Sequence, residues 1–494
     1  MSKNKNQDLE TENKIQNTPE KDVENLESSN SLSDNTTSKE KTKNGFGYKL
    51  DKFFKLTERG SSVKQEFTGG IVNFLVLSYM LVVIPGLFNG IDGGSLWKAL
   101  FVATILTTII ATVCMALYVN LPIILAPGIG LVSYIVQLVE NGTYSYAESM
   151  SICFIAGIVF LVLTLSGLRR KIIDAIPLCI KVAVPTGVGL FILNVGLGSS
   201  NSGILDMLNG SATSFAPIVA FVSFIIMVVL YIKNVKGSIF IGIVSGTVLD
   251  IIIKLCMKIN PFKALTENSW LPPFDELAKH SLFKFDFAGL FDGNIVSAIL
   301  SVLLVVFAVV LIDLFDTVGT LYATAEKAKL IDEKGEVLNM NRAMLVDGCE
   351  ALVSTSFGLP NTTSYVESTA GVVSGARTGL SSLFTSLFYI LALFISPLVM
   401  LIPVYATSPA LILVGLLMFD SVVKIDYKDL STSIPAILTI IIMPLTSNIT
   451  FGIAIGLISY TFIMILTGKF KKVNVFTYII TVLFILYFIM LYIK

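Results

Sequence analysis

The sequence predicts an all-α polytopic membrane protein built from two repeats of seven segments, with the second repeat inverted relative to the first. Three observations predict this fold class. The 494 residues are 54% hydrophobic and only 14% charged, with a mean hydropathy of +0.79. Apolar runs of about 20 residues, enough for a helix to cross a bilayer, recur along the chain. Two polar stretches, interrupted by Gly and Pro, stand at corresponding places in the two halves.

The first 50 residues differ in kind from the rest of the chain. They are rich in Asn, Ser, Thr, Lys and Glu and nearly free of aromatic residues. Such a composition cannot bury enough apolar surface to fold, so we expect residues 1–50 to be a disordered cytoplasmic tail. A plain solvated tail is a simpler interpretation than a regulatory or partner-binding one.

Ordinary membrane helices are predicted wherever the chain is continuously apolar. These runs are 68–89, 97–118, 147–167, 175–195, 214–232, 237–257, 295–325, 341–357, 380–402, 406–423, 432–446, 449–468 and 473–493.

Two further stretches, 121–140 and 359–378, follow the dipeptide Leu-Pro and are too polar for ordinary spans. We expect each to enter the membrane half extended and half helical, and the two to meet near its middle. Counting both gives fourteen spans, with 473–493 left over as an extra C-terminal helix.

Similar sequence segments occur in the same order in the two halves. "IPLCIKVAVPTGVGLFI" from Ile176 resembles "IPVYATSPALILVGLLMF" from Ile402, and "SIFIGIVSG" from Ser238 resembles "ITFGIAIGLIS" from Ile449. Seven spans per half is an odd number, which inverts the second half in the membrane. Broken segments at matching positions of inverted repeats are the sequence feature that points to a transport site.

The placement of Lys and Arg agrees with this span count. If the tail is cytoplasmic, the ends of even-numbered spans carry clusters such as Arg169 to Lys171, Lys233 with Lys236, and Lys469 to Lys472. Cytoplasmic loops are enriched in these residues. The agreement requires both Leu-Pro stretches to cross, and it places the linker 258–292 outside the cell.

Glu367 lies within the second Leu-Pro stretch, where a carboxylate at mid-bilayer costs about 2.5–3.5 kcal/mol. We therefore expect it to face an interior polar site. "PNTTSY" before it offers hydroxyl groups and extended backbone, and "VESTAG" can begin a half-helix whose N–H groups point inward. The alternative is a buried glutamate paired with a neighbouring helix.

A second acidic cluster, "LIDLFDTVGTLYATAEKA", ends a long apolar run. Asp313 and Asp316 are three residues apart and lie on nearly one helix face, with Thr320 on the adjoining side. For Asp313, a functional role and a structural role in capping or internal pairing are equally open. For Asp316, a functional role is favoured. Asp250 and Lys254 read as an ordinary i, i+4 ion pair.

Composition excludes several other classes of site. The one histidine, His280, is in a polar linker, and five cysteines are scattered singly. This leaves no CxxC or HExxH pattern and no histidine–cysteine pair for an intramembrane enzyme. No metal site and no cofactor are expected.

Four stretches carry a resemblance to a known family. They are "FKLTERGSSVKQEFTGGIVNFLVLSYML", "VNLPIILAPGIGL", "LFDTVGTLYATAEKAKLID" and "TTSYVESTAGVVSGARTGL". Together they resemble the adenine/guanine/hypoxanthine permease branch of the nucleobase permease superfamily, which also includes xanthine, uracil and ascorbate carriers. The resemblance runs from about Phe54 to Tyr492.

This resemblance implies an organisation into core and gate domains. Core segments are expected at 66–168 and 293–402, and gate segments at 172–257 and 404–468. The extracellular linker 258–292 joins the halves, and 472–494 is the extra helix. The resemblance also implies proton-coupled uptake of purine bases across the plasma membrane.

The resemblance implies that two acidic residues bind the purine base, and these match Asp316 and Glu367 here. The expected substrate contacts are Asp316, Glu367, Tyr365, Ser368, Thr320, Phe74, Val132, Ser133 and Tyr134. The expected proton-coupling residues are Glu367, Asp316 and Asp313. A carboxylate can accept two N–H groups of a flat purine side by side, and aromatic rings can border its faces.

Two departures from the family pattern affect the choice of purine. Val132 stands where the family usually has Asn, and Ile84 precedes Pro85 where Asn-Pro is usual. At each of these two positions the chain lacks a side-chain amide that could hydrogen-bond to the edge of a purine base. The expected partners are a purine, a proton and the lipid bilayer, with a homodimer left open and no nucleic acid. A sodium-coupled carrier and an anion carrier on the same fold remain the alternatives.

Overall fold

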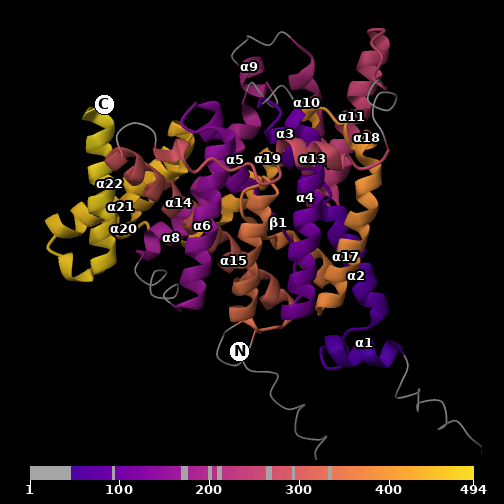
Figure 1. The fold of residues 1–494 in the computed structure, drawn as a ribbon, viewed down its shortest axis with the longest axis horizontal. Helices are drawn as coiled ribbons and strands as arrows, with labels where there is room; N and C mark the ends of the chain where they lie inside the picture. The colour runs from indigo at the N-terminus through magenta and orange to yellow at the C-terminus, as the bar shows by residue number, and fades with distance from the viewer. Residues whose placement is uncertain are drawn as a thin grey trace, which may run out of the picture. The chain divides into compact units, whose positions relative to one another are not determined.

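The computed structural model describes residues 46–91, 95–167, 176–198, 203–208, 214–262, 270–291, 295–331 and 337–493. The chain divides into two compact units, Met1–Leu50 and Asp51–Lys494. Of the predicted tail, all but residues 46–50 lies outside the described residues. The second unit is a bundle of long helices (Figure 1).

The first half of this bundle contains one strand among its helices. Its elements are α2 (Val63–Leu77), α3 (Met80–Leu87), α4 (Ser95–Cys114) with a π-helical turn (Met115–Val119), β1 (Leu125–Pro127), α5 (Ile129–Glu140), α6 (Tyr146–Leu165), α8 (Leu178–Leu197), α9 (Ile204–Leu208), α10 (Ala216–Ile232) and α11 (Ser238–Cys256). Helix α1 (Phe46–Phe54) precedes them, and the linker holds α13 (Phe274–His280) and a 3₁₀ turn (Gly289–Phe291).

The second half repeats this order. Its elements are α14 (Ile295–Ala328), α15 (Met340–Ser356), β2 (Thr362–Ser364), a 3₁₀ turn (Val366–Ser368), α16 (Thr369–Val373), α17 (Gly379–Ala392), a 3₁₀ turn (Leu393–Ile395), α18 (Ser396–Val399), α19 (Val404–Met418), a 3₁₀ turn (Phe419–Lys424), α20 (Leu430–Thr446), α21 (Ile449–Leu466), a 3₁₀ turn (Phe470–Lys472) and α22 (Val475–Ile493).

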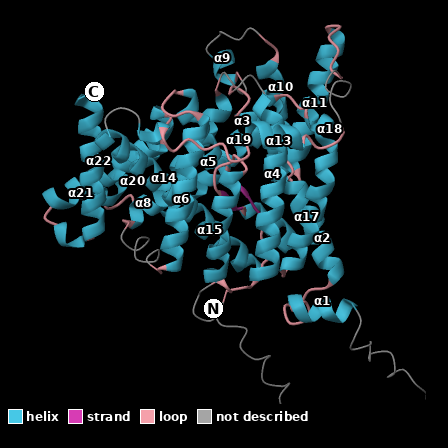
Figure 2. Ribbon diagram, in the orientation of Figure 1, coloured by secondary structure: helices cyan, strands magenta, loops and turns pink. Residues whose placement is uncertain are grey.

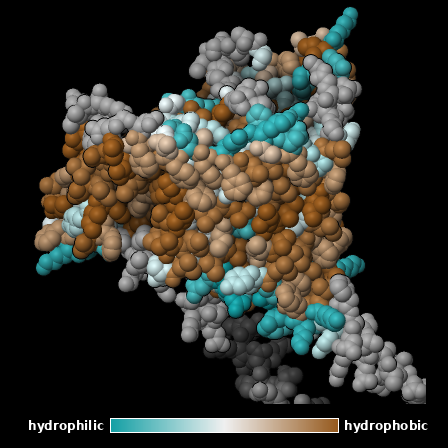
Figure 3. Space-filling model, viewed as in Figure 1, coloured by the Kyte–Doolittle hydropathy of each residue, from teal (hydrophilic) through white to brown (hydrophobic). Residues whose placement is uncertain are grey.

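Each apolar run predicted from the sequence contains a helix. Within the described ranges, eight helical segments of at least 18 residues are long and apolar enough to cross a membrane, and shorter apolar helices accompany them. Some of these segments join elements given separately above, such as α2 and α3 in Val63–Leu87. A hydrophobic band covers the visible face of the bundle between two more polar ends (Figure 3). These features are those of a multi-pass membrane protein.

The two Leu-Pro stretches meet, as predicted. Strands β1 and β2 pair antiparallel, with Leu125 opposite Ser364 and Ala126 opposite Thr363. They are the only strands in the described part of the chain and lie among the helices (Figure 2). Leu125 is four residues after Leu121, and its partner Ser364 is five residues after Leu359. Ala126 is five residues after Leu121, and its partner Thr363 is four residues after Leu359. An exchange of the two halves leaves this pairing unchanged, as an inverted repeat requires.

A second contact between repeat-related residues joins α8 to α19. Gly189 and Gly415 occupy the same position in the two similar sequences that begin at Ile176 and Ile402. A Cβ atom on Gly415 would lie 2.4 Å from the carbonyl oxygen of Gly189, and one on Gly189 would lie 2.7 Å from that of Gly415. Only glycine at both positions lets the two backbones approach so closely.

The helices pack mainly in two groups. One group contains α2, α3, α4, α6, α14, α15, α16 and α17, packed around the β1–β2 pair. The other contains α8, α10, α11, α19, α20 and α21. The extra helix α22 packs on α21 and α14, where the hydroxyls of Thr461 and Thr481 lie 2.9 Å apart and the Phe307 and Phe484 rings are in edge contact.

Helices α2 and α3 follow one another within one span, and the backbone stays in the right-handed helical region at Ser78 and Tyr79 between them. The Ser78 hydroxyl donates to the carbonyl of Leu75 at 2.9 Å. A side-chain hydroxyl that bonds its own backbone competes with the regular helical ladder. The side chain of Tyr79, at this junction, is fully buried. Tyr79 belongs to the surroundings of the candidate site.

Candidate functional site

Glu367 lies at the point where the two broken segments meet. The strand β2 leads directly into the 3₁₀ turn that carries Glu367. Two bonds to Ile124 fix this turn: its carbonyl accepts from the Tyr365 N–H at 3.0 Å, and its N–H donates to the Ser368 hydroxyl at 3.0 Å. The first repeat thus positions the acid of the second.

The helix after Glu367 is shorter than a typical half-span. Its first turn is 3₁₀ and its α-helical part is α16, which ends where Gly375 adopts a positive φ of 108°. The guanidinium of Arg377 donates to the carbonyl oxygens of Val372 and Ala376 and caps the C-terminal end of α16. The sequence predicted that a half-helix begins at "VESTAG", and the structure has a helix there that is short and begins with a 3₁₀ turn.

The carboxylate of Glu367 accepts a hydrogen bond from Tyr79, whose hydroxyl lies 3.1 Å from Oε1. Tyr79 was not among the residues that sequence reasoning selected. It lies in an apolar run without a charged or polar pattern, and only the packing of the two repeats brings it to Glu367. Despite this bond, the Glu367 side chain is only partly buried.

Asp316 lies on α14, close enough to Glu367 for the two carboxyl groups to interact electrostatically. It is hydrogen-bonded to Thr363 of β2 and remains partly exposed. One turn later, the Thr320 hydroxyl contacts that of Ser364 and donates to the carbonyl of Asp316 at 2.8 Å. The structure therefore brings Asp316, Thr320 and Glu367 together.

The other embedded acids are in a different environment. Asp313 and Asp347 are fully buried. The side-chain amide of Asn361 donates to Asp313 Oδ2 at 3.0 Å, and Thr317 donates to Asp347 Oδ1 at 3.1 Å. These bonds link α14 to the second Leu-Pro stretch and to α15, so both acids hold neighbouring segments together.

Aromatic side chains surround Glu367. Tyr365 is nearly buried, and its hydroxyl donates to the carbonyl of Pro127 at 2.6 Å. Tyr389 of α17 lies within electrostatic range of Glu367, and its buried hydroxyl has no partner among the described residues. The ring of Phe74 packs edge-on against that of Tyr389, with 5.2 Å between the centroids. Sequence reasoning selected Phe74 and Tyr365 but missed Tyr389.

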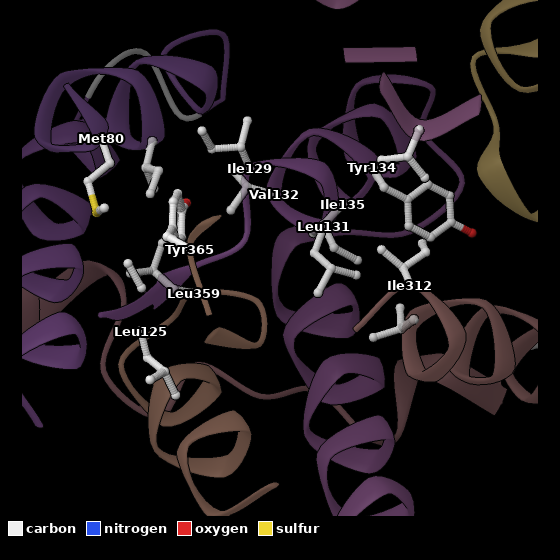
Figure 4. Close-up of a cluster of buried hydrophobic side chains, with 14 of the residues drawn as sticks. Met80, Leu125, Ile129, Leu131, Val132, Tyr134, Ile135, Ile312, Leu359 and Tyr365 are labelled. Atoms are coloured by element: carbon white, nitrogen blue, oxygen red, sulfur yellow. The ribbon is translucent and has the colours of Figure 1, made fainter. Parts of the chain in front are cut away.

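Helix α5 presents its predicted site residues to two different sides. Val132 and Ile129 point toward Tyr365, whereas Tyr134 lies apart, beside Ile312 (Figure 4). The Tyr134 hydroxyl is bonded to that of Thr450 on α21. Val132, which is fully buried, thus lies on the Tyr365 side of α5, and Tyr134 does not.

Further buried polar groups besides the Tyr389 hydroxyl have no hydrogen-bond partner in the described part of the chain, and two of them belong to α2 and α5. These two are the Ser133 hydroxyl and the side-chain amide nitrogen of Asn73, and both residues are fully buried. The amide oxygen of Asn73 is occupied, because it accepts from the N–H of Gly371 at 2.9 Å. Buried groups without partners are rare in folded proteins and are available to a ligand.

Metal chemistry has no candidate centre in the residues that the structure describes. No three His, Cys, Asp or Glu side chains there are grouped so that they could hold an ion. The site instead offers two acidic residues that are only partly buried, several hydroxyls and aromatic surfaces. Such groups can bind a flat ligand rich in N–H groups.

Solved structures with a similar fold are membrane transporters. The transmembrane domain of a cyanobacterial bicarbonate transporter, BicA, superposes with a TM-score of 0.57 at 16% identity, over 79% of this chain and 96% of the other. The murine anion transporter Slc26a9 in its inward-facing state gives 0.53 at 13% identity, over 88% and 74%. The chain therefore has the seven-plus-seven inverted-repeat transporter fold that the sequence predicted.

Sequence comparison identifies the family. The model of the Permease family matches residues 64–455. The guanine/hypoxanthine permease PbuO of Bacillus subtilis is 36% identical over 89% of this chain and 100% of its own length. The adenine permease AdeQ of Escherichia coli is 31% identical over 88% of this chain and 95% of its own length.

The chain belongs to the Permease family, in the branch of the guanine/hypoxanthine and adenine permeases. It is a multi-pass membrane transporter and not an enzyme. The resemblance noted in the sequence is thereby confirmed.

Proposed function

We propose that this permease takes up purine nucleobases together with protons across the cell membrane. One observation carries the assignment of the site. Asp316 and Glu367 retain exposed surface at the crossing of the two broken segments, whereas Asp313 and Asp347 are buried and bonded to neighbouring segments. The names of the relatives support a purine as the substrate.

The chemistry of the site suits a flat neutral base. A carboxylate can accept two adjacent N–H groups, and such charge-assisted bonds are about twice as strong as neutral ones. Asp316 and Glu367 reach the base edge from two sides in this proposal. Tyr365 and Phe74 border its faces, and Thr320, Ser368 and Ser133 contribute hydroxyl groups.

Val132 and Tyr134 take different roles in this proposal. Val132 lies on the Tyr365 side of α5, where an amide would meet the base, so it influences which purine is preferred. Tyr134 is bonded to Thr450 of α21 and is assigned to the contact between the two helix groups.

The coupling proton is assigned to the same acids. Protonation of Glu367 or Asp316 changes the number of N–H groups that the site can accept, so proton binding and base binding are linked. Asp313 is hydrogen-bonded to Asn361 and is assigned the role of holding the second Leu-Pro stretch in place. No metal or other cofactor is needed for this scheme.

Transport is proposed to occur by alternating access between the two helix groups. The group packed around the β1–β2 pair corresponds to the expected core domain and carries the site. The group of α8, α10, α11, α19, α20 and α21 corresponds to the expected gate. The N-terminus is assigned to the cytoplasm on the placement of Lys and Arg.

Competition for uptake tests the substrate class. Labelled hypoxanthine uptake into cells that express the permease should be reduced by excess unlabelled adenine or guanine, and much less by uracil. Cells that carry the empty expression vector serve as the control for background uptake. Equal inhibition by uracil, or no uptake above that control, would reject the purine assignment.

The coupling ion is tested separately in proteoliposomes. An inward proton gradient should drive accumulation of the base, and a protonophore should abolish it with sodium present on both sides. Accumulation that survives the protonophore but disappears when sodium is replaced by potassium would establish the sodium-coupled alternative.

An anion carrier on the same fold is the second candidate, because the similar solved structures include anion transporters. Two partly exposed carboxyl groups at the crossing disfavour an anionic substrate by charge repulsion. Uptake of labelled bicarbonate above that of cells without the permease would support this candidate instead.

A further inference from the structure

We propose that a cationic cavity, separate from the site at Glu367, binds a ligand carrying a phosphate group and that its occupancy regulates transport. The cavity has a volume of about 400 Å³ and lies between the segment that precedes α2, the end of α4 and the start of α15. Its walls include Lys55, Arg59, Tyr118, Asn120 and Arg342.

The charges in this cavity favour an anion. Three cations, Lys55, Arg59 and Arg342, face a single carboxylate among the lining residues, that of Glu58. Glu58 pairs with Lys55 at 3.2 Å. Within the described residues no carboxylate lies at ion-pair distance from either arginine, and Glu58 and Glu66 attract Arg59 only at longer range. The walls therefore retain an excess of positive charge.

The arrangement of the cations indicates a phosphate group. Arg59 and Arg342 come from separate elements, so they can approach different oxygens of one anion with several oxygen atoms. Guanidinium groups bind phosphate with two parallel N–H bonds, which a single-point anion cannot use. The Arg342 guanidinium is already held over the Tyr118 ring, 5.5 Å from its centroid.

The remaining surface of the cavity suits a ligand larger than free phosphate. Tyr118 is half exposed, and the volume is within the range of sites for small organic molecules. A purine nucleoside monophosphate offers a flat ring as well as a phosphate. The headgroup of an anionic phospholipid offers the same phosphate chemistry, and the experiment separates these two sources.

The walls of the cavity tie together the helices of the transport site. The Asn120 side chain accepts from the N–H of Gly379, at the start of α17, at 2.8 Å. Its backbone carbonyl accepts from Arg59. The side-chain amide of Asn339, at the start of α15, donates to the carbonyl of Val119 at 3.0 Å. A ligand bound here would brace the ends of α4, α15 and α17 against one another.

Helix α4 also connects the cavity to the strand pair. Near its end, the Thr112 hydroxyl both accepts from the N–H of Leu125 and contacts its carbonyl, each at 3.2 Å. Leu125 belongs to β1, whose partner β2 leads into Glu367. Regulation through this path rests on the proposed transport function, whereas binding of the ligand does not.

Binding is measured on the purified full-length permease by calorimetry. The probes are inorganic phosphate, GMP, and nanodiscs of phosphatidylcholine with or without phosphatidylglycerol. The double variant Lys55→Gln/Arg342→Gln removes two cations without disturbing Arg59, which holds the carbonyls of Asn120 and Arg377. Lys233→Gln, an exposed cation at the end of α10, is the matched control.

Saturable binding of GMP in phosphatidylcholine nanodiscs, weakened at least tenfold in the double variant and unchanged in Lys233→Gln, would support a soluble ligand. A thermal stabilisation by phosphatidylglycerol that the double variant loses, without GMP binding, would support a lipid headgroup. Absence of both effects, or equal effects in the double variant and the control, would overturn the proposal.

Regulation is tested afterwards with the bound probe. In proteoliposomes, GMP on the side of the cavity should change the rate of hypoxanthine uptake by the native chain and not by the double variant. If GMP binds but the protein carries no purine, only the proposed function fails. If purine uptake occurs but no phosphate probe binds, only this inference fails.

Discussion

The hydroxyl of Tyr79 donates a hydrogen bond of 3.1 Å to the carboxylate of Glu367, across 288 positions of sequence. The tyrosine lies between α2 and α3 of the first repeat, and the glutamate lies in the 3₁₀ turn after β2 of the second. This contact is one of several that join the two repeats at the candidate site. It also gives Glu367 a neighbour that can hold the carboxylate in place without neutralising it.

Replacement of Tyr79 by phenylalanine should weaken purine binding while the fold is retained. The variant removes only the hydroxyl, and a hydrogen bond to a charged group contributes about 1.5–3 kcal/mol, roughly ten- to a hundredfold in affinity. Purine affinity of the purified protein is the measurement. Tyr231→Phe, an exposed tyrosine on α10, is the control. Equal affinities in the two variants would show that Tyr79 does not support the site.

Asp316→Asn and Glu367→Gln should each reduce purine affinity by about ten- to a hundredfold. Both changes preserve volume but replace acceptor oxygens with an amide that donates toward the N–H groups of the base. Both proteins should still insert, since neutral amides are cheaper in a membrane than carboxylates.

Asp313→Asn is the matched comparison for these two variants, because Asp313 is fully buried and bonded to Asn361. It should lower thermal stability and change purine affinity less than the other two. Near-normal affinity in both Asp316→Asn and Glu367→Gln would place the purine site elsewhere.

Val132→Asn should broaden or shift the base preference. Val132 points to the Tyr365 side of α5, where an added amide can donate to and accept from a base edge (Figure 4). Uptake of labelled hypoxanthine is measured in competition with adenine, guanine and xanthine. Val136→Asn, one turn further along α5, tests whether any added amide has this effect. An unchanged order of competitors would reject the role of Val132.

Glu66→Gln should lower the thermal stability of the purified permease. The Glu66 carboxylate is fully buried and accepts from the N–H groups of Arg377 at 2.8 Å and Ser381 at 3.1 Å, around the start of α17. The amide variant turns one acceptor into a donor, which should cost about 1–3 kcal/mol. Glu58→Gln, at an exposed position, should change the melting temperature little. Equal melting temperatures would contradict this role.

Gly415→Ala should destabilise the contact between α8 and α19. The new Cβ atom would lie 2.4 Å from the carbonyl oxygen of Gly189, so one helix has to move, at a cost of about 1–3 kcal/mol. Gly86→Ala is the control, because a Cβ atom there meets nothing within 4 Å. Thermal unfolding in detergent compares the two. A melting temperature for Gly415→Ala at or above that of Gly86→Ala would contradict the close approach.

Much of the fold follows from the sequence because its signals are local. Apolar runs have the length of a membrane span whatever surrounds them, and the Leu-Pro dipeptides mark the two broken segments that pair in the structure. The same holds for the predicted pair of Asp250 and Lys254, which lies at 2.8 Å, because residues four apart share a helix face.

Within the candidate site, the sequence by itself determined only which residue types were present and on which segments. The tertiary structure decided that Asp316 and Glu367 keep exposed surface while Asp313 is buried, that Tyr79 reaches Glu367, and that Tyr134 turns to Thr450. The physical reason is that burial and hydrogen-bond partners depend on segments hundreds of residues apart. No periodicity within a single span specifies which of those segments will face it.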